Sequence, residues 1–580
     1  MAEDGKTGMR AGLANYGDAG FSLFLRKAMI KGMGYSDDAL ERPIVGITDT
    51  FSGYNACHRT VPDLIHAIER GVLLAGGLPV RFPTVSVHEA FSHPTSMFLR
   101  NLMAMDTEEM VRAQPMDAVV LIGGCDKTVP AQLMGAASAG KPAIMVVTGP
   151  MMTGDYKGER LGACTDCRRL WGMHRSGEIG ADEIDVIGGR LMPTAGTCMV
   201  MGTASTMALM TEALGMMLPG GASIPAVHAD RLRHAEASGA RAVALAKDNV
   251  TPDKIMTPAA FENALRMLLA IGGSTNGIVH IAAVAGRLGI KIDLDAFDRL
   301  GEETPVVVDL KPTGQHYMED LFKAGGAAPI LRALKPLLNL GELTVSGKTL
   351  GEDIDAAPAD WGQTVVRPLH DPIYPKGGIA VLRGNLAPEG AIVKQSAAKQ
   401  ELLVHEGRAV VFDSLEDMAN RLDDPDLDVR ADDILVLRNS GPKGAPGMPE
   451  SGYIPIPKKL AAQGVKDMVR MSDARMSGTA FGTIVLHISP EAAAGGPLAF
   501  VRSGDRIRLD VPNRSLELLV ADSELAERRK GWAPPHHEGS ERGYLKLYLD
   551  QVNQAEDGCD FDFLTKRPVV ASVPAGSRTR

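Results

Sequence analysis

The chain has 580 residues, of which 45% are hydrophobic and 23% are charged, and its formal net charge is −10. This composition is typical of a globular protein with two or three domains and excludes disorder on a large scale. The acidic balance, without any dense run of Lys or Arg, argues against nucleic acid or a membrane as the main partner. It is compatible with an anionic substrate at a local site.

The N-terminus contains neither an apolar core nor a signal-peptide cleavage pattern, so we expect a cytoplasmic protein. The most apolar stretch, residues 199–218, is interrupted by Glu212 and several small polar residues. It predicts a buried, Met-rich helix rather than a membrane span. In a reducing compartment the six cysteines are expected to be free thiols or metal ligands rather than disulfides.

The first two-thirds of the chain alternates short apolar runs with helical patterns. Strands are predicted at 43–48, 80–87, 118–122 and 143–148, and helices at 62–76, 131–139, 258–272 and 278–288. Strand, turn, helix and strand at this spacing predict an α/β/α domain with a mostly parallel sheet.

The character of the sequence changes near residues 372–378, after which short β-rich segments are separated by Gly, Pro or Asn turns. Residues 510–515 have the pattern of a hairpin corner. We therefore predict an N-terminal α/β domain over 1–375 and a second, β-rich domain over 376–580. The tail after Lys566 is expected to be loose or to form an oligomer contact. The predicted strands of the second domain are 379–383, 402–405, 409–412, 434–437, 484–487, 506–511 and 516–520.

Three cysteines lie in loops or at a helix start of the predicted α/β layer. Cys125 directly follows the strand 118–122, within the sequence GGCDK. Functional sites form outside the carboxyl ends of strands in open α/β sheets, and glycines let the backbone turn there. Cys198 lies near the start of an apolar helix, and Cys57 lies in a polar loop after a strand. Each alone is more often structural than functional, whereas together they resemble a dispersed cluster site.

Cys164 and Cys167 form a CxxC motif. A lone CxxC is weak evidence for a zinc or redox site, because such sites need further ligands. The sequence contains no second CxxC.

Two carboxylates follow predicted strands in the same layer. Glu89 comes after the strand 80–87, and Asp126 comes directly after Cys125. Both offer the hard oxygen ligands that Mg²⁺ prefers, although each alone is equally typical of a solvated loop or a helix cap. The ammonium group of Lys127 would repel such an ion unless the amine is neutral or carboxylated.

The second domain contains a Gly/Pro-rich loop, residues 441–450, that ends at Glu450. Such a loop forms either a backbone nest for an anion or a tight turn. Ser477 precedes a strand, but no His or Asp near it is arranged as in a hydrolase triad. By local sequence alone it is a turn serine.

Several long blocks of the chain, taken together, resemble the dihydroxy-acid and sugar-acid dehydratases, most closely the aldonate (pentonate) branch. They are residues 123–130 (GGCDKTVP), 196–207, 270–276, 382–391, 441–450 and 472–498, and the matching positions run in order from about residue 45 to about residue 565. The resemblance implies an N-terminal α/β domain, a C-terminal β-barrel-like domain and an active site between them. It implies removal of water from a 2,3-dihydroxy or sugar acid to give a 2-keto-3-deoxy acid.

The resemblance also implies the cofactors and the residues that hold them. A 2Fe–2S cluster is expected on Cys57, Cys125 and Cys198, with one iron left open, although three thiolates would equally hold a 4Fe–4S cluster. Magnesium is expected near Glu89, Asp126, carboxylated Lys127 and Glu450. Ser477 occupies the position of the proposed base, and Thr479 is expected near the substrate. Cys164, Cys167 and Cys559 match no ligand position, and we expect a homodimer or homotetramer.

One departure from the family pattern concerns the substrate. The aldonate branch usually carries Arg-Pro-Thr after the Glu89 block, whereas His93 stands in place of that arginine here. An imidazole and a guanidinium contact oxygens differently, so His93 is a candidate substrate contact. The Ser-Gly-Thr motif at 477–479 resembles the sugar-acid branch more than the Ser-Gly-Gly of the branched-chain amino-acid enzyme. We therefore expect an aldonate as substrate, with 2,3-dihydroxyisovalerate as the nearest alternative.

Two alternatives from other classes remain at this point. An iron–sulfur redox sensor would need the three cysteines but not Glu89, Asp126, Glu450 or Ser477. A phosphosugar-binding protein would use the loop 441–447 and would carry no cluster.

Overall fold

A four-stranded parallel sheet forms the first layer of the computed structural model, which describes residues 7–13, 15–359 and 361–573. The strands lie in the order β2–β1–β3–β4. They are β1 (Ile44–Asp49), β2 (Leu78–Pro83), β3 (Ala118–Gly123) and β4 (Ala143–Val147). The predicted parallel α/β layer is confirmed, except that β2 ends at Pro83 rather than at residue 87.

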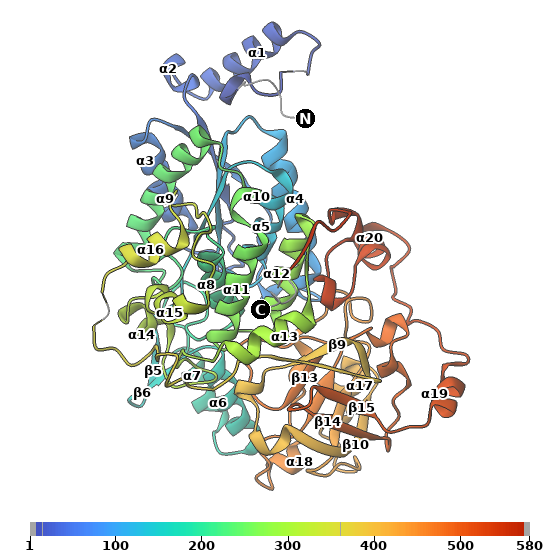
Figure 1. Ribbon diagram of the computed structural model, residues 1–580. Helices are drawn as coiled ribbons and strands as arrows, with labels where there is room; N and C mark the ends of the chain where they lie inside the picture. The colour runs from blue at the N-terminus through green and yellow to red at the C-terminus, as the bar shows by residue number, and fades with distance from the viewer. Residues whose placement is uncertain (1–6, 14, 360, 574–580) are drawn as a thin grey trace.

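Helices connect successive strands and cover the sheet (Figure 1). They are α3 (Val61–Leu74), α4 (Arg100–Ala113) and α5 (Thr128–Ala139). Helix α3 packs closely against α9 (Ala229–Asp248), because two glycines lie at their crossing. A Cβ atom on Gly71 would lie 1.9 Å from the Glu236 carbonyl oxygen, and one on Gly239 would lie 2.3 Å from that of Ile68. Only glycine fits at this crossing.

The core of this layer also contains the predicted Met-rich helix. It is α8 (Thr203–Ala213), every residue of which is buried, and it packs against α11 (Pro258–Ala270) and α12 (Asn276–Arg287). Among the described residues, no helix is both long enough and apolar enough to span a bilayer.

The second part of the molecule contains a closed eight-stranded barrel, drawn in yellow to red in Figure 1. Its strand order is β10–β11–β12–β13–β9–β8–β15–β14. Apolar side chains such as Leu382, Val436 and Leu509 form a buried core of their own. The strands are β8 (Ala380–Gly384), β9 (Ala387–Val393), β10 (Val404–Phe412), β11 (Ile434–Leu437), β12 (Arg470–Ser472), β13 (Ile484–Ser489), β14 (Arg506–Asp510) and β15 (Ser515–Leu518).

The barrel differs from the predicted strands in three places. The segments 402–405 and 409–412 belong largely to one strand, β10, because the polar residues between them continue the ladder with β14. Strands β9 and β12 are additions to the prediction. The predicted hairpin corner is confirmed, since Asp510 pairs with Ser515 between antiparallel β14 and β15. The domain boundary between residues 375 and 376 stays a prediction.

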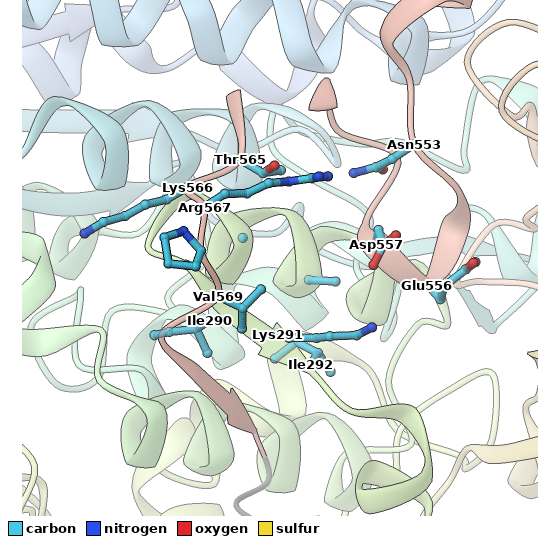
Figure 2. A pocket seen from close by; sticks show the side chains of 14 residues that line it. Ile290, Lys291, Ile292, Asn553, Glu556, Asp557, Thr565, Lys566, Arg567 and Val569 are labelled. Carbon is cyan, nitrogen blue, oxygen red and sulfur yellow. The ribbon is translucent and has the colours of Figure 1, made fainter. Parts of the chain in front are cut away.

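The described part of the C-terminal tail is ordered rather than loose. Strand β16 (Ala571–Val573) pairs in parallel with β7 (Ile290–Ile292) of the first layer. Beside this pair lies a cavity of about 340 Å³ that contains charges of both signs, including Lys291, Arg567 and Glu556 (Figure 2). Backbone pairing therefore holds the tail as far as Val573, and residues 574–580 lie outside the described part of the chain.

Candidate active site

The predicted site residues of the first layer gather at one edge of the parallel sheet. Cys57 lies in η2 (Ala56–His58) after β1, Glu89 begins η3 (Glu89–Phe91) after β2, and Cys125–Lys127 follow β3. Strands β1 and β3 are neighbours although β2 separates them in the chain. The order of the strands reverses at this point, and ligand sites of open α/β sheets form at such positions.

Thiols form one half of the site. The Sγ atoms of Cys57 and Cys125 and a ring nitrogen of His88 all lie within 4.8 Å of one another. Both cysteines are buried. Cys198 lies beside Cys164, with 3.9 Å between their sulfur atoms. Soft thiolate ligands suit iron–sulfur clusters, so this donor set fits the cofactor that the family resemblance implies.

The protonation of these thiols depends on their neighbours. Hydrogen bonding to Cys125 and burial raise the pKa of Cys57, and hydrogen bonding to Cys164 and burial raise the pKa of Cys198. Hydrogen bonds from Cys167 and Cys198 lower the pKa of Cys164 to about 3. Metal binding requires thiolates. The positive charge of bound iron must therefore offset the free-energy cost of ionising the Cys57 and Cys198 thiols.

His58, which the sequence analysis did not single out, hydrogen-bonds the backbone of the turn that carries Cys125. Its Nε2 accepts hydrogen bonds from the backbone N–H groups of Gly124 (3.0 Å) and Cys125 (3.1 Å), and its Nδ1 contacts the Thr50 carbonyl oxygen (2.9 Å). Burial lowers the pKa of His58 to about 4, so the imidazole is neutral and retains this acceptor. A Cβ atom on Gly124 would lie 1.8 Å from Thr148 Oγ1, which explains the glycine.

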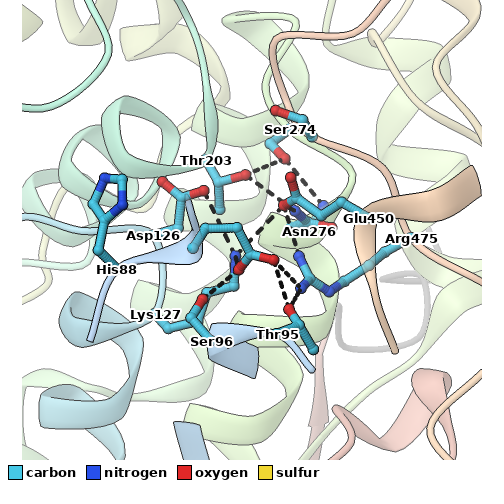
Figure 3. Close-up of polar contacts among 12 residues, drawn as sticks. His88, Thr95, Ser96, Asp126, Lys127, Thr203, Ser274, Asn276, Glu450 and Arg475 are labelled. Atoms are coloured by element: carbon cyan, nitrogen blue, oxygen red, sulfur yellow. Dashed lines mark hydrogen bonds and ion pairs between the residues drawn. The ribbon is translucent and has the colours of Figure 1, made fainter. Parts of the chain in front are cut away.

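Carboxylates form the other half of the site and surround Lys127 (Figure 3). The fully buried Lys127 Nζ lies 3.3 Å from Glu89 Oε2, 3.6 Å from Asp126 Oδ2 and 3.5 Å from Glu450 Oε1. Glu450 comes from the loop before β12, so the two parts of the molecule meet here. The structure brings together all the residues predicted to bind magnesium.

Each charge in this group shifts the others. Burial alone would raise the pKa of Glu89, but Lys127 and Arg475 outweigh it and hold that pKa well below its ordinary value. Burial raises the pKa of Asp126 to about 6 against the opposing effect of Lys127. Burial and Arg475 would lower the pKa of Lys127, yet the carboxylates outweigh them and raise it. The surroundings favour a positive charge at this position.

Glu450 is held through one of its two oxygens. Its Oε1 accepts hydrogen bonds from Arg475 Nη1 (2.7 Å) and Asn276 Nδ2 (3.1 Å). Within the described part of the chain, Glu450 Oε2 accepts no hydrogen bond, and the buried Oδ1 of Asn276 has no partner. Two uncommitted hard oxygens beside two further carboxylates fit a magnesium ion.

Arg475, Thr95 and Ser96 are parts of the site that sequence reasoning missed. Besides Glu450, the buried Arg475 contacts Thr95 Oγ1 (3.0 Å) through Nη2. Thr95 donates to Glu89 Oε1 (2.6 Å), and Ser96 donates to Glu89 Oε2. The Arg475 guanidinium thus links Glu450, from the barrel part of the chain, to Glu89, which follows strand β2. Arg475 could have been found from its position in the sequence, because it lies two residues before Ser477 in a block that resembles the family.

The loop that carries Ser477 and Thr479 approaches the Cys198 segment at Gly202. Ser477 Oγ is 2.8 Å from Thr479 Oγ1, and among the described residues no imidazole or carboxylate hydrogen-bonds to it. Gly202 lets the loop approach, because a Cβ atom there would lie 3.1 Å from Thr479 Cγ2 and 3.9 Å from Cys198 Cβ. Thr479, the predicted substrate contact, and Cys198 therefore lie on either side of Gly202. His93 is exposed on the loop after η3, and its role as a substrate contact stays a prediction.

Known proteins resemble the chain over most of its length. Residues 42–353 match the dihydroxy-acid/6-phosphogluconate dehydratase N-terminal model, and residues 364–559 match the C-terminal model. The chain is 46% identical to an L-arabinonate dehydratase of Rhizobium leguminosarum bv. trifolii over 95% of both chains. It is 42% identical to a 6-deoxy-6-sulfo-D-gluconate dehydratase of Pseudomonas putida over 93% of both. It is 40% identical to a dihydroxy-acid dehydratase of Desulfosudis oleivorans over 92% of this chain and 97% of that one. The chain belongs to the dihydroxy-acid/6-phosphogluconate dehydratase family.

Proposed function

We propose that this protein is an iron–sulfur-dependent hydro-lyase that converts a sugar acid of the aldonate class to a 2-keto-3-deoxy acid. The observation that carries the proposal is the convergence of two different donor sets at one strand edge. Thiols suited to iron lie beside carboxylates suited to magnesium at the edge where β1, β2 and β3 end. The function of a redox sensor does not require the carboxylate set, and phosphosugar binding does not require the thiols.

Each cofactor is assigned to named residues in this proposal. A 2Fe–2S cluster is bound by Cys57, Cys125 and Cys198. Magnesium is bound by Glu89, Asp126, Glu450 and Lys127, whose amine is carboxylated. The neutral Lys127 amine forms a bond to the carbon of CO2 and releases a proton, which gives a further anionic ligand instead of an ammonium group that would repel the ion. The bound ion would then supply the positive charge that the three surrounding carboxylates favour.

The chain's own residues then divide the chemistry of losing water. Magnesium held by the carboxylates would supply Lewis-acid stabilisation of charge at the substrate carboxylate, and a cluster held by the thiols would supply a Lewis-acidic iron for the 3-hydroxyl. Ser477 Oγ removes the proton from C2, which requires that nearby positive charge favours its alkoxide. The Thr479 hydroxyl, 2.8 Å away, orients Ser477 and contacts the substrate together with His93. Arg475 contacts both Glu450 and Glu89 and so fixes the positions of the two carboxylates relative to each other.

Sugar acids are favoured over 2,3-dihydroxyisovalerate on two grounds. The relatives named for sugar-acid substrates are 46% and 42% identical to the chain, against 40% for the dihydroxy-acid dehydratase. The Ser477-Gly478-Thr479 motif carries a hydroxyl where the Ser-Gly-Gly pattern has none. A side-chain hydroxyl suits a substrate with several hydroxyl groups, because each buried hydroxyl needs a hydrogen-bond partner.

Compartment and assembly are part of the same proposal. All six cysteines are free, which suits a reducing cytoplasm. Helix α1 (Ala19–Gly32) exposes large apolar side chains, with Phe24 and Met29 each 67% exposed. We propose that this apolar face lies at the interface of a homodimer or homotetramer.

The direct test is a keto-acid assay of anaerobically purified enzyme over a panel of pentonates, hexonates and 2,3-dihydroxyisovalerate. We expect turnover with at least one aldonate, and the specificity constant for it should exceed that for dihydroxyisovalerate. A preference for dihydroxyisovalerate would move the protein to the branched-chain amino-acid pathway. Iron-loaded protein that dehydrates no acid in the panel would overturn the assignment as an enzyme.

Magnesium is expected to be required separately from the cluster. Chelation that spares the visible absorption of the cluster should stop turnover, and added Mg²⁺ should restore it. Arg475→Met should raise the Mg²⁺ concentration for half-maximal activity by about 10–100-fold, the usual effect of losing a group that orients a metal ligand. Arg438→Met is the control, since Arg438 bonds Asp413 and barrel carbonyls away from the site. Full activity without any divalent ion would contradict the magnesium assignment.

A further inference from the structure

Cys164 lies within the thiol group although no family block predicts it there. Its Sγ is 3.9 Å from that of Cys198. Cys164, Cys167 and Cys198 all pack against one small apolar cluster that includes Met151, Val200 and Tyr317. Cys57 and Cys125 form the neighbouring pair of sulfurs. The site therefore contains two pairs of thiols rather than three separate ones.

The spacing of the second pair matches two ligands of one metal ion. A tetrahedral site with metal–sulfur bonds of about 2.3 Å places two sulfurs roughly 3.8 Å apart. The Cys164–Cys198 separation of 3.9 Å agrees with this value. Iron–sulfur clusters of the 2Fe–2S type are ordinarily held by four thiolates, two on each iron.

The loop that carries Cys164 is held in place from two sides. Behind it, Asp166 accepts hydrogen bonds from the Gly162 backbone N–H (2.8 Å) and the Tyr317 hydroxyl (3.1 Å). In front, the Thr165 hydroxyl donates to the Thr479 carbonyl oxygen (3.1 Å). Cys164 is thus positioned by the structure around it and is linked through one residue to the substrate side of the site.

We propose that Cys164 is a fourth, exchangeable ligand of the cluster, which binds the iron held by Cys198 until substrate enters. The inference rests on the proposed function, in which that iron otherwise has only one protein ligand. In the exchange one iron–sulfur bond breaks and a coordination position becomes free. No electron is transferred, and Cys164 leaves the iron as a thiolate. A resting cluster with four sulfur ligands is shielded from oxygen, whereas a three-coordinated one exposes an iron.

The test compares anaerobically reconstituted wild type, Cys164→Ala and, as control, Cys559→Ala. Cys559 is also a free thiol, but it is buried against Met448 Sδ (3.7 Å). We expect Cys164→Ala to bind iron and sulfide, to show shifted g-values in the EPR spectrum of the reduced cluster and to lose its visible absorption in air about tenfold faster or more. Cys559→Ala should retain the wild-type spectrum.

A second measurement uses the wild type alone and does not depend on the folding of a variant. Alkylation by iodoacetamide, mapped by mass spectrometry, should label Cys164 in the cluster-free protein but not in the loaded enzyme. Identical EPR spectra for wild type and Cys164→Ala, or a Cys164 disulfide in the loaded enzyme, would overturn the proposal. A wild type that takes up no cluster would instead refute the proposed function itself.

Discussion

Cys57→Ser, Cys125→Ser and Cys198→Ser are each expected to give a folded but colourless protein without dehydratase activity. Serine nearly preserves the volume of cysteine, so packing survives, but it replaces a soft thiolate that iron prefers. The Cys57–Cys125 pair is buried, and Cys164 lies beside Cys198 rather than within this pair. Visible absorption and the iron content per chain report the loss, and circular dichroism reports the retained fold.

Cys559→Ser is the matched control for these variants. Cys559 is also buried, but its thiol contacts Met448 Sδ (3.7 Å), and its backbone carbonyl accepts from Arg100 (2.9 Å). Burial raises the pKa of Cys559 to about 12, so it stays a neutral thiol. The variant should keep its colour and activity. Wild-type iron content in Cys125→Ser would remove that residue from the ligand set.

Ser477→Ala is expected to lose most turnover while keeping the cluster, magnesium and measurable substrate binding. Loss of a general base typically costs about 10²–10⁴-fold in rate. Wild type should exchange the C2 proton of the substrate with deuterated solvent or show a C2 deuterium isotope effect, and the variant should show neither. Single-turnover kinetics and mass spectrometry of recovered substrate provide the two measurements.

The control for Ser477 is a serine that shapes the same segment without facing the site. Ser472 Oγ accepts a hydrogen bond from the Ala474 backbone N–H (3.0 Å), so Ser472→Ala tests whether mere loosening of the segment slows catalysis. We expect this variant to remain far more active than Ser477→Ala. Near-normal turnover in Ser477→Ala, or loss of its cluster, would show that Ser477 is a structural turn residue.

Periodicity and turn residues predicted most of the fold but not its short or irregular strands. β3 and β4 are continuous apolar runs with a helix between them, and such runs are readily recognised. β9 contains Pro388 and Gly390, both unfavourable inside a strand, and it exists because β8 and β13 pair with it on either side. β12 has three residues and no alternation to detect. Its place depends on closure of the barrel.

The site was predictable where motifs adjoin strand ends and not where only the fold brings residues together. Cys125 and Asp126 follow β3 directly, so the sequence alone places them at the sheet edge. Cys164 lies 34 residues before Cys198, and no spacing rule places the two sulfurs 3.9 Å apart. Arg475 and Thr95 are separated by 380 residues, yet they hydrogen-bond to each other. The Arg475–Thr95 contact depends on how the barrel packs against the sheet, and the Cys164–Cys198 contact depends on how two loops of the first part of the chain fold together.

The two donor sets are not distributed equally along the chain. Every thiol of the site lies between Cys57 and Cys198, whereas the carboxylate set is incomplete without Glu450. A ribosome that adds about 5–20 residues per second exposes the sulfur ligands well before the barrel has been made. All sulfur ligands of the proposed cluster are therefore synthesised before the carboxylate set of the proposed magnesium site is complete. That set also has to wait for the barrel to fold against the sheet.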